Sequence, residues 1–272
     1  MGFLQIKRIN LNLDVKNSYR IVHISDTHAI KIKKNSEQRA IDSEKAWYNV
    51  RRSFADHFKE KCLDKQMIPS AKCLHKLINY ANSSAADVVV LSGDIIDYYN
   101  KDNYQLLEKE VSRINKPYVF VVGNHETFQN VNSDYDIITN NQSDYGKVVV
   151  GELCFVSLDD TKQKFSEDQY EFLLTQTKLY QNIIIVIHEP IATRNNHKKM
   201  KVFEDYYVVD CQRSDEITKK TLDLLCYNEN IKLILCGHVH GYHKSSFAKN
   251  KYQICCSSGL IGKVNNILIK GK

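Results

Sequence analysis

The chain has 272 residues, 43% of them hydrophobic and 26% charged, a balance typical of a globular protein that can bury a core of its own. Its 38 lysines and arginines exceed its 32 acidic residues by only six, and no dense basic block stands out, so an anionic small molecule is a better expectation than a nucleic acid. The sequence has no apolar run long enough for a membrane span, no signal peptide and no CxxC pair among its eight cysteines, so we expect a cytoplasmic protein with free thiols and no membrane partner.

Short β-branched runs alternate with helical patterns along the chain. Residues 4–13 alternate apolar and polar side chains, which predicts a half-buried antiparallel strand. Continuously apolar runs, typical of strands covered on both faces, follow at 20–25, 87–92, 118–122, 147–151, 153–158, 182–188, 232–237 and 252–258. Helical patterns lie at 43–62, 70–82, 102–114, 166–177 and 214–228.

The alternation of strands and helices predicts a layered α/β protein, and without a linker or repeat we expect one domain over residues 1–272. Ser70 and Ser166 are the predicted N-caps of their helices. Residues 29–86 are too long for a simple crossover between the first two apolar runs. We therefore predict a helical insertion at about 29–86, over one end of the sheet.

Side chains that bind metals follow five of the apolar runs. They are Asp26 and His28 in DTH, Asp94 and Asp97 in GDIID, Asn124 and His125 in GNHE, His188 in HEP, and His238 and His240 in GHVH. Ligands of open α/β sheets bind outside the carboxyl ends of the strands, so we expect these side chains to meet at one edge. Imidazole and carboxylate together suit zinc, manganese or iron, and a carboxylate such as Asp94 can bridge two cations. Each motif alone is equally a common turn or a buried histidine, so the ordered set carries the prediction.

The five motifs, in this order and spanning residues 26 to 240, resemble those of the calcineurin-like metallophosphoesterase superfamily. The resemblance implies a four-layer α/β/β/α sandwich of two mixed β-sheets flanked by helices. It also implies two divalent or mixed-valence metal ions, either manganese, iron or zinc. One ion would be bound by Asp26, His28, Asp94 and His240, and the other by Asp94, Asn124, His188 and His238.

The resemblance also assigns roles to two residues that are not ligands. His125 would contact the phosphate and protonate the leaving group or stabilise its charge, and Asp97 would orient His125. A bridging hydroxide would attack phosphorus in line. We therefore expect a hydrolase of ester bonds, a phosphodiesterase or phosphatase, acting on a phosphorylated small molecule or a nucleotide.

Two alternatives stay open. A non-catalytic metal-binding scaffold on the same fold would be expected to have lost ligands, and a metal-dependent nuclease would be expected to carry a broad basic groove. Protein phosphatases of the family carry arginines in the second and third motifs, which GDIIDYY and GNHET lack. Neither the choice between monoester and diester nor the oligomeric state follows from the sequence.

Substrate contacts are predicted in two segments. In the insertion, Trp47, Tyr48, Arg51 and Arg52 could cap the site, although helix packing and solvation are the simpler interpretation. After His188, a mobile basic loop is as good an interpretation as a phosphate or base contact for Arg194, Asn195 and His197. His243 lies outside the motifs and is predicted to be a surface residue.

Overall fold

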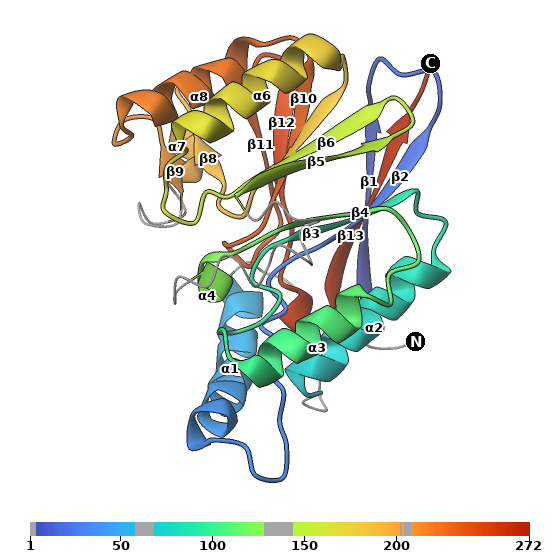
Figure 1. Cartoon of the computed structure of the whole chain (residues 1–272), viewed down its shortest axis with the longest axis vertical. Helices are drawn as coiled ribbons and strands as arrows, with labels where there is room; N and C mark the ends of the chain where they lie inside the picture. The colour runs from blue at the N-terminus through green and yellow to red at the C-terminus, as the bar shows by residue number, and fades with distance from the viewer. Residues whose placement is uncertain (1–3, 58–67, 128–143, 202, 204–207) are drawn as a thin grey trace.

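Two β-sheets face each other at the centre of the computed structural model, which describes residues 4–57, 68–127, 144–201, 203 and 208–272, without the side chains of 48–57 (Figure 1). The five-stranded sheet has the order β1 (Gln5–Asn12), β13 (Lys263–Lys270), β2 (Tyr19–Ile24), β3 (Val88–Ser92) and β4 (Tyr118–Val121). The six-stranded sheet has the order β11 (His243–Ala248), β12 (Lys251–Cys255), β10 (Ile231–Cys236), β7 (Ile183–Val186), β6 (Leu153–Leu158) and β5 (Tyr145–Val150). Strands β8 (Ile191–Ala192) and β9 (Val209–Asp210) form a separate pair.

Helices cover the outer face of each sheet. Helices α2 (Ser70–Ser83) and α3 (Lys101–Val111) lie on the five-stranded sheet, and α6 (Glu167–Leu179) and α8 (Glu216–Tyr227) on the six-stranded sheet (Figure 1). Both sheets are mixed, because β13 is antiparallel to β2 while β5 and β11 are antiparallel to β6 and β12. The predicted four-layer sandwich is confirmed.

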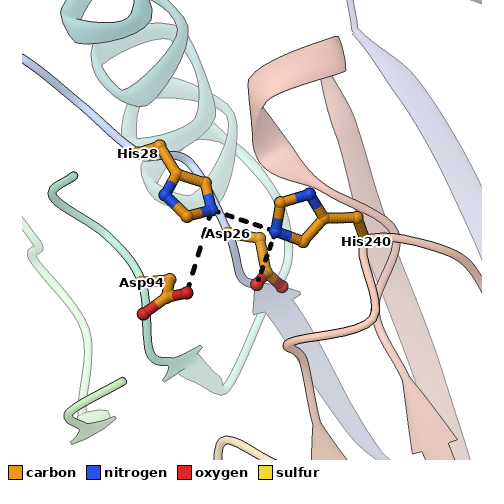
Figure 2. Close-up of side chains that lie close together, drawn as sticks. All are labelled: Asp26, His28, Asp94 and His240. Atoms are coloured by element: carbon orange, nitrogen blue, oxygen red, sulfur yellow. Dashed lines mark hydrogen bonds and ion pairs between the residues drawn. The ribbon is translucent and has the colours of Figure 1, made fainter. Parts of the chain in front are cut away.

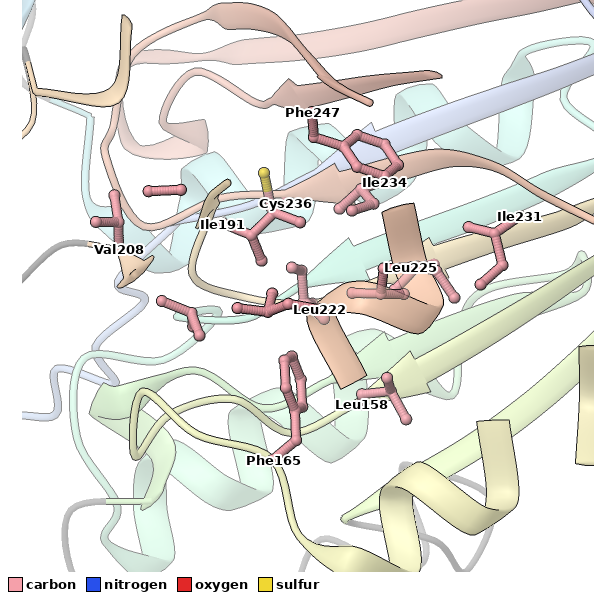
Figure 3. Close-up of a cluster of buried hydrophobic side chains, with 14 of the residues drawn as sticks. Leu158, Phe165, Ile191, Val208, Leu222, Leu225, Ile231, Ile234, Cys236 and Phe247 are labelled. Atoms are coloured by element: carbon pink, nitrogen blue, oxygen red, sulfur yellow. The ribbon is translucent and has the colours of Figure 1, made fainter. Parts of the chain in front are cut away.

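Most of the apolar strands bury both of their faces, as their unbroken hydrophobic runs predicted, but β5 at the edge of the six-stranded sheet leaves Val149 46% exposed. In β3, Val88 and Val90 point into the core between the two sheets, whereas Val89 and Leu91 point into the core beneath α2 and α3. A third core, around Leu222, Leu225 and Phe247, fills the space between the six-stranded sheet and its helices (Figure 3). The positions of the central strands are therefore fixed from two sides.

The prediction that residues 4–13 form an antiparallel strand is wrong in its direction. Strand β1 pairs with β13 in parallel, from Gln5 opposite Lys263 to Asn12 opposite Lys270. The alternation itself is confirmed at Ile9 and Leu11, which are buried. The direction differs because β13, from the far end of the chain, lies between β1 and β2 and separates them.

Within its described residues, 29–57 and 68–86, the inserted segment contains one helix more than a crossover needs. Helix α1 (Gln38–His57) is added ahead of α2, which is the crossover helix between the parallel strands β2 and β3. Ser70 is not the N-cap of α2, since Pro69 holds that position and Ser70 is the first helical residue. Its amide donates instead to Glu44 of α1 at 2.8 Å, so an acceptor from another helix serves a buried amide that has no partner within its own helix.

Three smaller elements remain within the described residues. They are the short helices α4 (Asn124–Thr127) and α7 (His197–Met200) and the 3-10 turn η2 (Gly259–Ile261). The seven cysteines within the described ranges are free thiols. None of the helices in those ranges combines the length and the apolar character that crossing a bilayer would require.

Candidate metal centre

The motif residues of both sheets converge at one place. Asp26 and His28 follow β2 and Asp94 follows β3, all in the five-stranded sheet. From the six-stranded sheet, His188 follows β7, and His238 and His240 follow β10. The predicted meeting of strand ends therefore occurs, but it joins two sheets rather than one edge.

The first group consists of Asp26, His28, Asp94 and His240, all buried, with one ligand atom from each within 4.8 Å of the others (Figure 2). The Nε2 atoms of His28 and His240 are 3.0 Å apart. Asp26 Oδ1 lies 3.5 Å from His240 Nε2, and Asp94 Oδ2 lies 3.8 Å from His28 Nε2. These are the four residues predicted to bind one ion.

The second group consists of Asp94, His188 and His238, with Asn124 beside them. His188 Nε2 lies 3.1 Å from His238 Nδ1, 3.1 Å from Asn124 Oδ1 and 3.3 Å from Asp94 Oδ2. His188 Nδ1 donates to the carbonyl of Ser92 at 2.8 Å, which leaves the Nε2 lone pair facing the group. Residues of the second predicted site are thus also in contact.

The donor sets fit metal ions. Two nitrogens, each about 2.1 Å from a common ion, are about 3.0 Å apart when the angle at the ion is about 90°. The pairs His28–His240 and His188–His238 have nitrogen separations of 3.0 and 3.1 Å. Asp94 Oδ2 lies near a nitrogen of each group, the position that a bridging carboxylate requires.

Burial keeps most of these histidines neutral. It lowers the pKa of His238 to about 3, with His188 nearby adding to the effect, and lowers the pKa values of His28 and His240 as well. His188 differs, because the adjacent Asp94 outweighs burial and raises its pKa. Neutral imidazole is the form that coordinates metals, so the buried environment favours binding at three of the four histidines.

Five of the candidate ligands have left-handed backbone conformations. The φ angles are +53° for Asp26, +42° for His28, +51° for Asp94, +68° for His238 and +58° for His240. Residues other than glycine adopt such backbone angles at a cost of about 1–3 kcal/mol each, and residues strained in this way cluster at functional sites. This shared strain argues that the loops are shaped for the positions of these side chains.

Two glycines make room for the ligands. A Cβ atom at Gly93, which has φ +85°, would lie 2.4 Å from His188 Nδ1. A Cβ atom at Gly123 would lie 2.2 Å from Asp94 Oδ1, although the φ angle of this glycine is not left-handed. Gly93 therefore serves both the turn and the close approach of a ligand, whereas Gly123 serves only the close approach.

His125 lies beside the two groups, at the start of α4. Its Nδ1 donates to the carbonyl oxygen of Asp97 at 2.6 Å and lies 3.3 Å from the Asp97 carboxylate. Burial alone would lower the pKa of His125, but Asp94 and Asp97 outweigh it and raise the pKa to about 10. The contact expected between Asp97 and His125 is present, with the backbone carbonyl making the shorter bond.

Asp97 also anchors two other rings. Its Oδ1 accepts a hydrogen bond from Trp47 Nε1 at 2.5 Å and lies 3.4 Å from His28 Nδ1. Trp47 stacks on His28, with ring centroids 4.0 Å apart and an interplanar angle of 26°. Trp47, proposed from the sequence only as a possible cap, is therefore in contact with the site.

Glu126 is a contributor that the sequence analysis passed over. Its buried carboxylate accepts hydrogen bonds from the amides of Asp94, Ile95, Ile96 and Gly123, at 2.6 to 2.9 Å. These bonds join the loops after β3 and β4, which hold Asp94 and Asn124. The one sign of this role in the sequence is that Glu126 directly follows the GNH motif, at a position that is buried in the fold.

The other predicted substrate contacts lie elsewhere or outside the description. Asn195 Nδ2 donates to the Phe247 carbonyl at 3.2 Å, His197 Nε2 lies 3.4 Å from Asp210 Oδ2, and Arg194 is exposed. The side chains of Tyr48, Arg51 and Arg52 fall outside the described part of the chain. His243 is not a surface residue as predicted but partly buried, because it starts β11 with its ring edge-on to Phe203 at 5.1 Å.

Comparisons with known proteins identify the family and the fold. The chain is 24% identical over 232 residues to a probable glycerophosphodiester phosphodiesterase, GpdQ, of Arcobacter nitrofigilis, covering 81% of this chain and 71% of the relative. It is 22% identical over 182 residues to a probable cyclic nucleotide phosphodiesterase of Coxiella burnetii, covering 62% and 66%. In fold it resembles a dimetal phosphatase of Danio rerio, with a TM-score of 0.57, 14% identity and coverage of 89% and 88%. The family profile of calcineurin-like phosphoesterases matches residues 19–242, and the chain therefore belongs to that family.

Proposed function

We propose that this phosphoester hydrolase is a two-metal phosphodiesterase that acts on a small molecule or nucleotide. The proposed ligands are Asp26, His28, Asp94, Asn124, His188, His238 and His240. The position of Asp94 Oδ2, within 3.8 Å of a nitrogen in each ligand group, carries the proposal. The names of the two curated relatives favour a diester over a monoester. A cytoplasmic setting is part of the proposal, as the free thiols suggest.

The residues around the phosphate would have separate roles in metal binding and in proton donation. A bound pair of manganese, iron or zinc ions would neutralise phosphoryl oxygens and activate water. His125 holds its Nδ1 proton against the Asp97 carbonyl, which can only accept, so its Nε2 is the atom left for the substrate. With its side chain 33% exposed, His125 can reach a substrate and give a proton to the leaving oxygen.

Turnover of two chromogenic esters tests the proposal. The protein, loaded in turn with manganese, iron or zinc and checked by elemental analysis, is assayed with bis-p-nitrophenyl phosphate and with p-nitrophenyl phosphate. We expect a higher kcat/KM for the diester and about two metal ions per chain. Metal binding without turnover of either ester would instead support a non-catalytic scaffold, and preference for the monoester would make the protein a phosphatase.

A further inference from the structure

We propose that a pocket beside His125 binds the base of a nucleotide substrate and that Arg39 selects it; the inference rests on the phosphodiesterase function proposed above. The pocket has a volume of about 280 Å³ and is lined by Arg39, Ser43, Asp97, Tyr98, Tyr99, Asn124 and His125. Asn124 and His125 belong to the candidate site. A group esterified to a phosphate held there therefore has this pocket directly beside it.

One face of the inserted helix α1 forms the outer wall. Arg39, Ser43 and Trp47 are spaced four residues apart, so they lie along the same side of the helix. Trp47 fixes which way this side faces, because it contacts Asp97 and His28. Arg39 and Ser43 are thereby turned toward the pocket.

A second contact holds α1 in place. The buried Glu44 carboxylate accepts hydrogen bonds from both the amide and the hydroxyl of Ser70, at the start of α2. With Glu44 bound to α2 and Trp47 bound at the site, the wall is formed before any substrate arrives. A preformed wall reduces the ordering cost of binding, which favours a site over an accidental gap.

The chemistry of the wall suits a flat, polar ring. The Arg39 guanidinium lies 4.0 Å from the centroid of the Tyr98 ring, and it covers this ring, which is only 6% exposed. Arg39 itself is exposed, so its other side can receive a planar group. Guanidinium planes stack on nucleobases, and their fork of donors matches base acceptors.

The size and the composition of the pocket narrow the range of substrate groups that it could bind. A volume of about 280 Å³ is at the lower limit of ligand pockets, which span roughly 300–1,000 Å³, so it has room for one base rather than a polymer. A glycerol or ethanolamine group has no π face to stack on Arg39. A nucleoside joined to the phosphate is therefore the substrate group that uses the features of this wall.

A matched pair of diesters isolates the base. Thymidine 5′-(p-nitrophenyl phosphate) and methyl p-nitrophenyl phosphate release the same leaving group and differ only in the nucleoside. In the metal-loaded protein we expect kcat/KM to be at least about 10-fold higher for the thymidine ester, the effect of one good contact. In Arg39→Ala this preference should fall about 10-fold, because only the thymidine ester places a base against Arg39.

Two further variants separate the shape of Arg39 from its charge. Arg39→Lys keeps the charge but not the flat fork, so it should also lose the preference. Lys45→Ala, on another side of α1, removes an exposed charge but should keep the preference for the thymidine ester. Circular dichroism verifies that each variant is folded. A preference equal in wild type and Arg39→Ala would overturn the inference alone, whereas failure of the metal-loaded protein to hydrolyse either diester would overturn the proposed function and the inference with it.

Binding can be followed without turnover. Trp47 is the only tryptophan in the chain and lies on the same helix side as Arg39, so its fluorescence reports on the pocket. Thymidine monophosphate should change this signal at about 10-fold lower concentration in wild type than in Arg39→Ala. Inorganic phosphate should behave alike in both proteins, and equal affinities for the nucleotide would contradict the inference.

Discussion

At the scale of single residues, the site depends on side chains that contact several partners at once. Asp94 faces both ligand groups, its Oδ1 accepts the His125 amide at 3.0 Å, and its own amide is bound by Glu126 at 2.8 Å. Asp97 joins His28, His125 and Trp47. A change at either carboxylate therefore reaches metal binding and proton transfer together.

His125 can be separated from metal binding, because it is not in either ligand group. In His125→Ala we expect kcat to fall by about 10²–10⁴-fold, the usual contribution of a general acid. Metal content by elemental analysis should match that of the native protein, while Asp94→Asn, as a control, should bind less metal. Native activity in His125→Ala would refute the proposed role of this histidine.

Trp47→Phe tests the hydrogen bond to Asp97. The variant keeps an aromatic ring over His28 but lacks the indole N–H, so Asp97 loses the bond of 2.5 Å. Loss of such a supporting contact is expected to lower kcat by about 10–100-fold, with little change in KM for the methyl ester. Lys45→Ala on the same helix serves as the control. If kcat of Trp47→Phe equals that of the control, Trp47 only packs the helix.

The candidate metal ligands could be recognised in the sequence because each motif is local. Asp26 lies two residues beyond the end of β2 and His240 lies four residues beyond the end of β10, so the strand ends bring these side chains together. Trp47 and Glu44 could not be placed in this way. Their partners, Asp97 and Ser70, are 50 and 26 residues away, and no periodicity specifies how an inserted helix packs.

At the scale of elements, a sequence pattern predicts the N-cap of a helix only where the capping side chain hydrogen-bonds to its own helix. Ser166 caps α6 as predicted, in a capping box with Gln169. Ser70 is also a serine at the start of its helix but does not cap α2, because its hydroxyl donates to Glu44 of α1 and accepts from the Ile30 amide. A sequence pattern cannot anticipate a competitor from another helix.

The N-cap of α8 gives an element-scale prediction with a pH dependence. Hydrogen bonds from Thr218 lower the pKa of the exposed Asp215 below its usual 3.8. Because the pKa of Asp215 is lower in the folded protein than in the unfolded chain, its carboxylate stabilises the fold fully at pH values above the unfolded-state pKa. This stabilisation is lost as the pH falls through the folded-state pKa. Asp215→Ala should therefore cost about 0.5–2 kcal/mol at neutral pH, measured by urea unfolding, and less in acid.

Asp215→Asn is the matched control, because the amide oxygen still accepts from the Thr218 amide but does not titrate. Its stability relative to Asp215→Ala should persist in acid. If Asp215→Ala lost as much stability in acid as at neutral pH, the carboxylate would not be the source of the effect.

At the scale of the whole molecule, the site ties the two sheets together. Asp26, His28 and Asp94 come from one sheet, and His188, His238 and His240 from the other. The Asp26 carboxylate also accepts the His238 amide, at 3.0 and 3.1 Å. Bound ions would link the sheets at the end of their shared core.

Chelation should therefore lower thermal stability. A ligand present at about 100 times its Kd stabilises the folded state by about 2.7 kcal/mol, which corresponds to roughly 5–10 °C for a protein of this size. We expect scanning calorimetry to record a fall of at least this order with EDTA and recovery on adding zinc. Asp94→Asn should respond less. Unchanged melting of the native protein on chelation would argue against ions that bridge the sheets.

Strand order was the feature of the whole molecule least accessible from sequence. Residues 263–270 lack a strong strand signal, with Asn265 and Asn266 in the middle, yet β13 lies within the five-stranded sheet. Both asparagines are buried there, and Arg20 donates to Asn266 Oδ1 at 3.1 Å. Such contacts between distant parts of the chain leave no trace in local patterns.

The place of β13 also bears on when the protein can mature during synthesis. Ile21 pairs with Ile267, so the sheet that carries Asp26 and Asp94 stays open until 246 further residues (267 − 21) have left the ribosome. At about 5–20 residues per second, that interval is roughly 12–50 s. Until then the candidate ligands Asp26 and Asp94 lack a complete sheet to hold them, so a nascent chain stalled before residue 263 should not assemble the candidate metal centre.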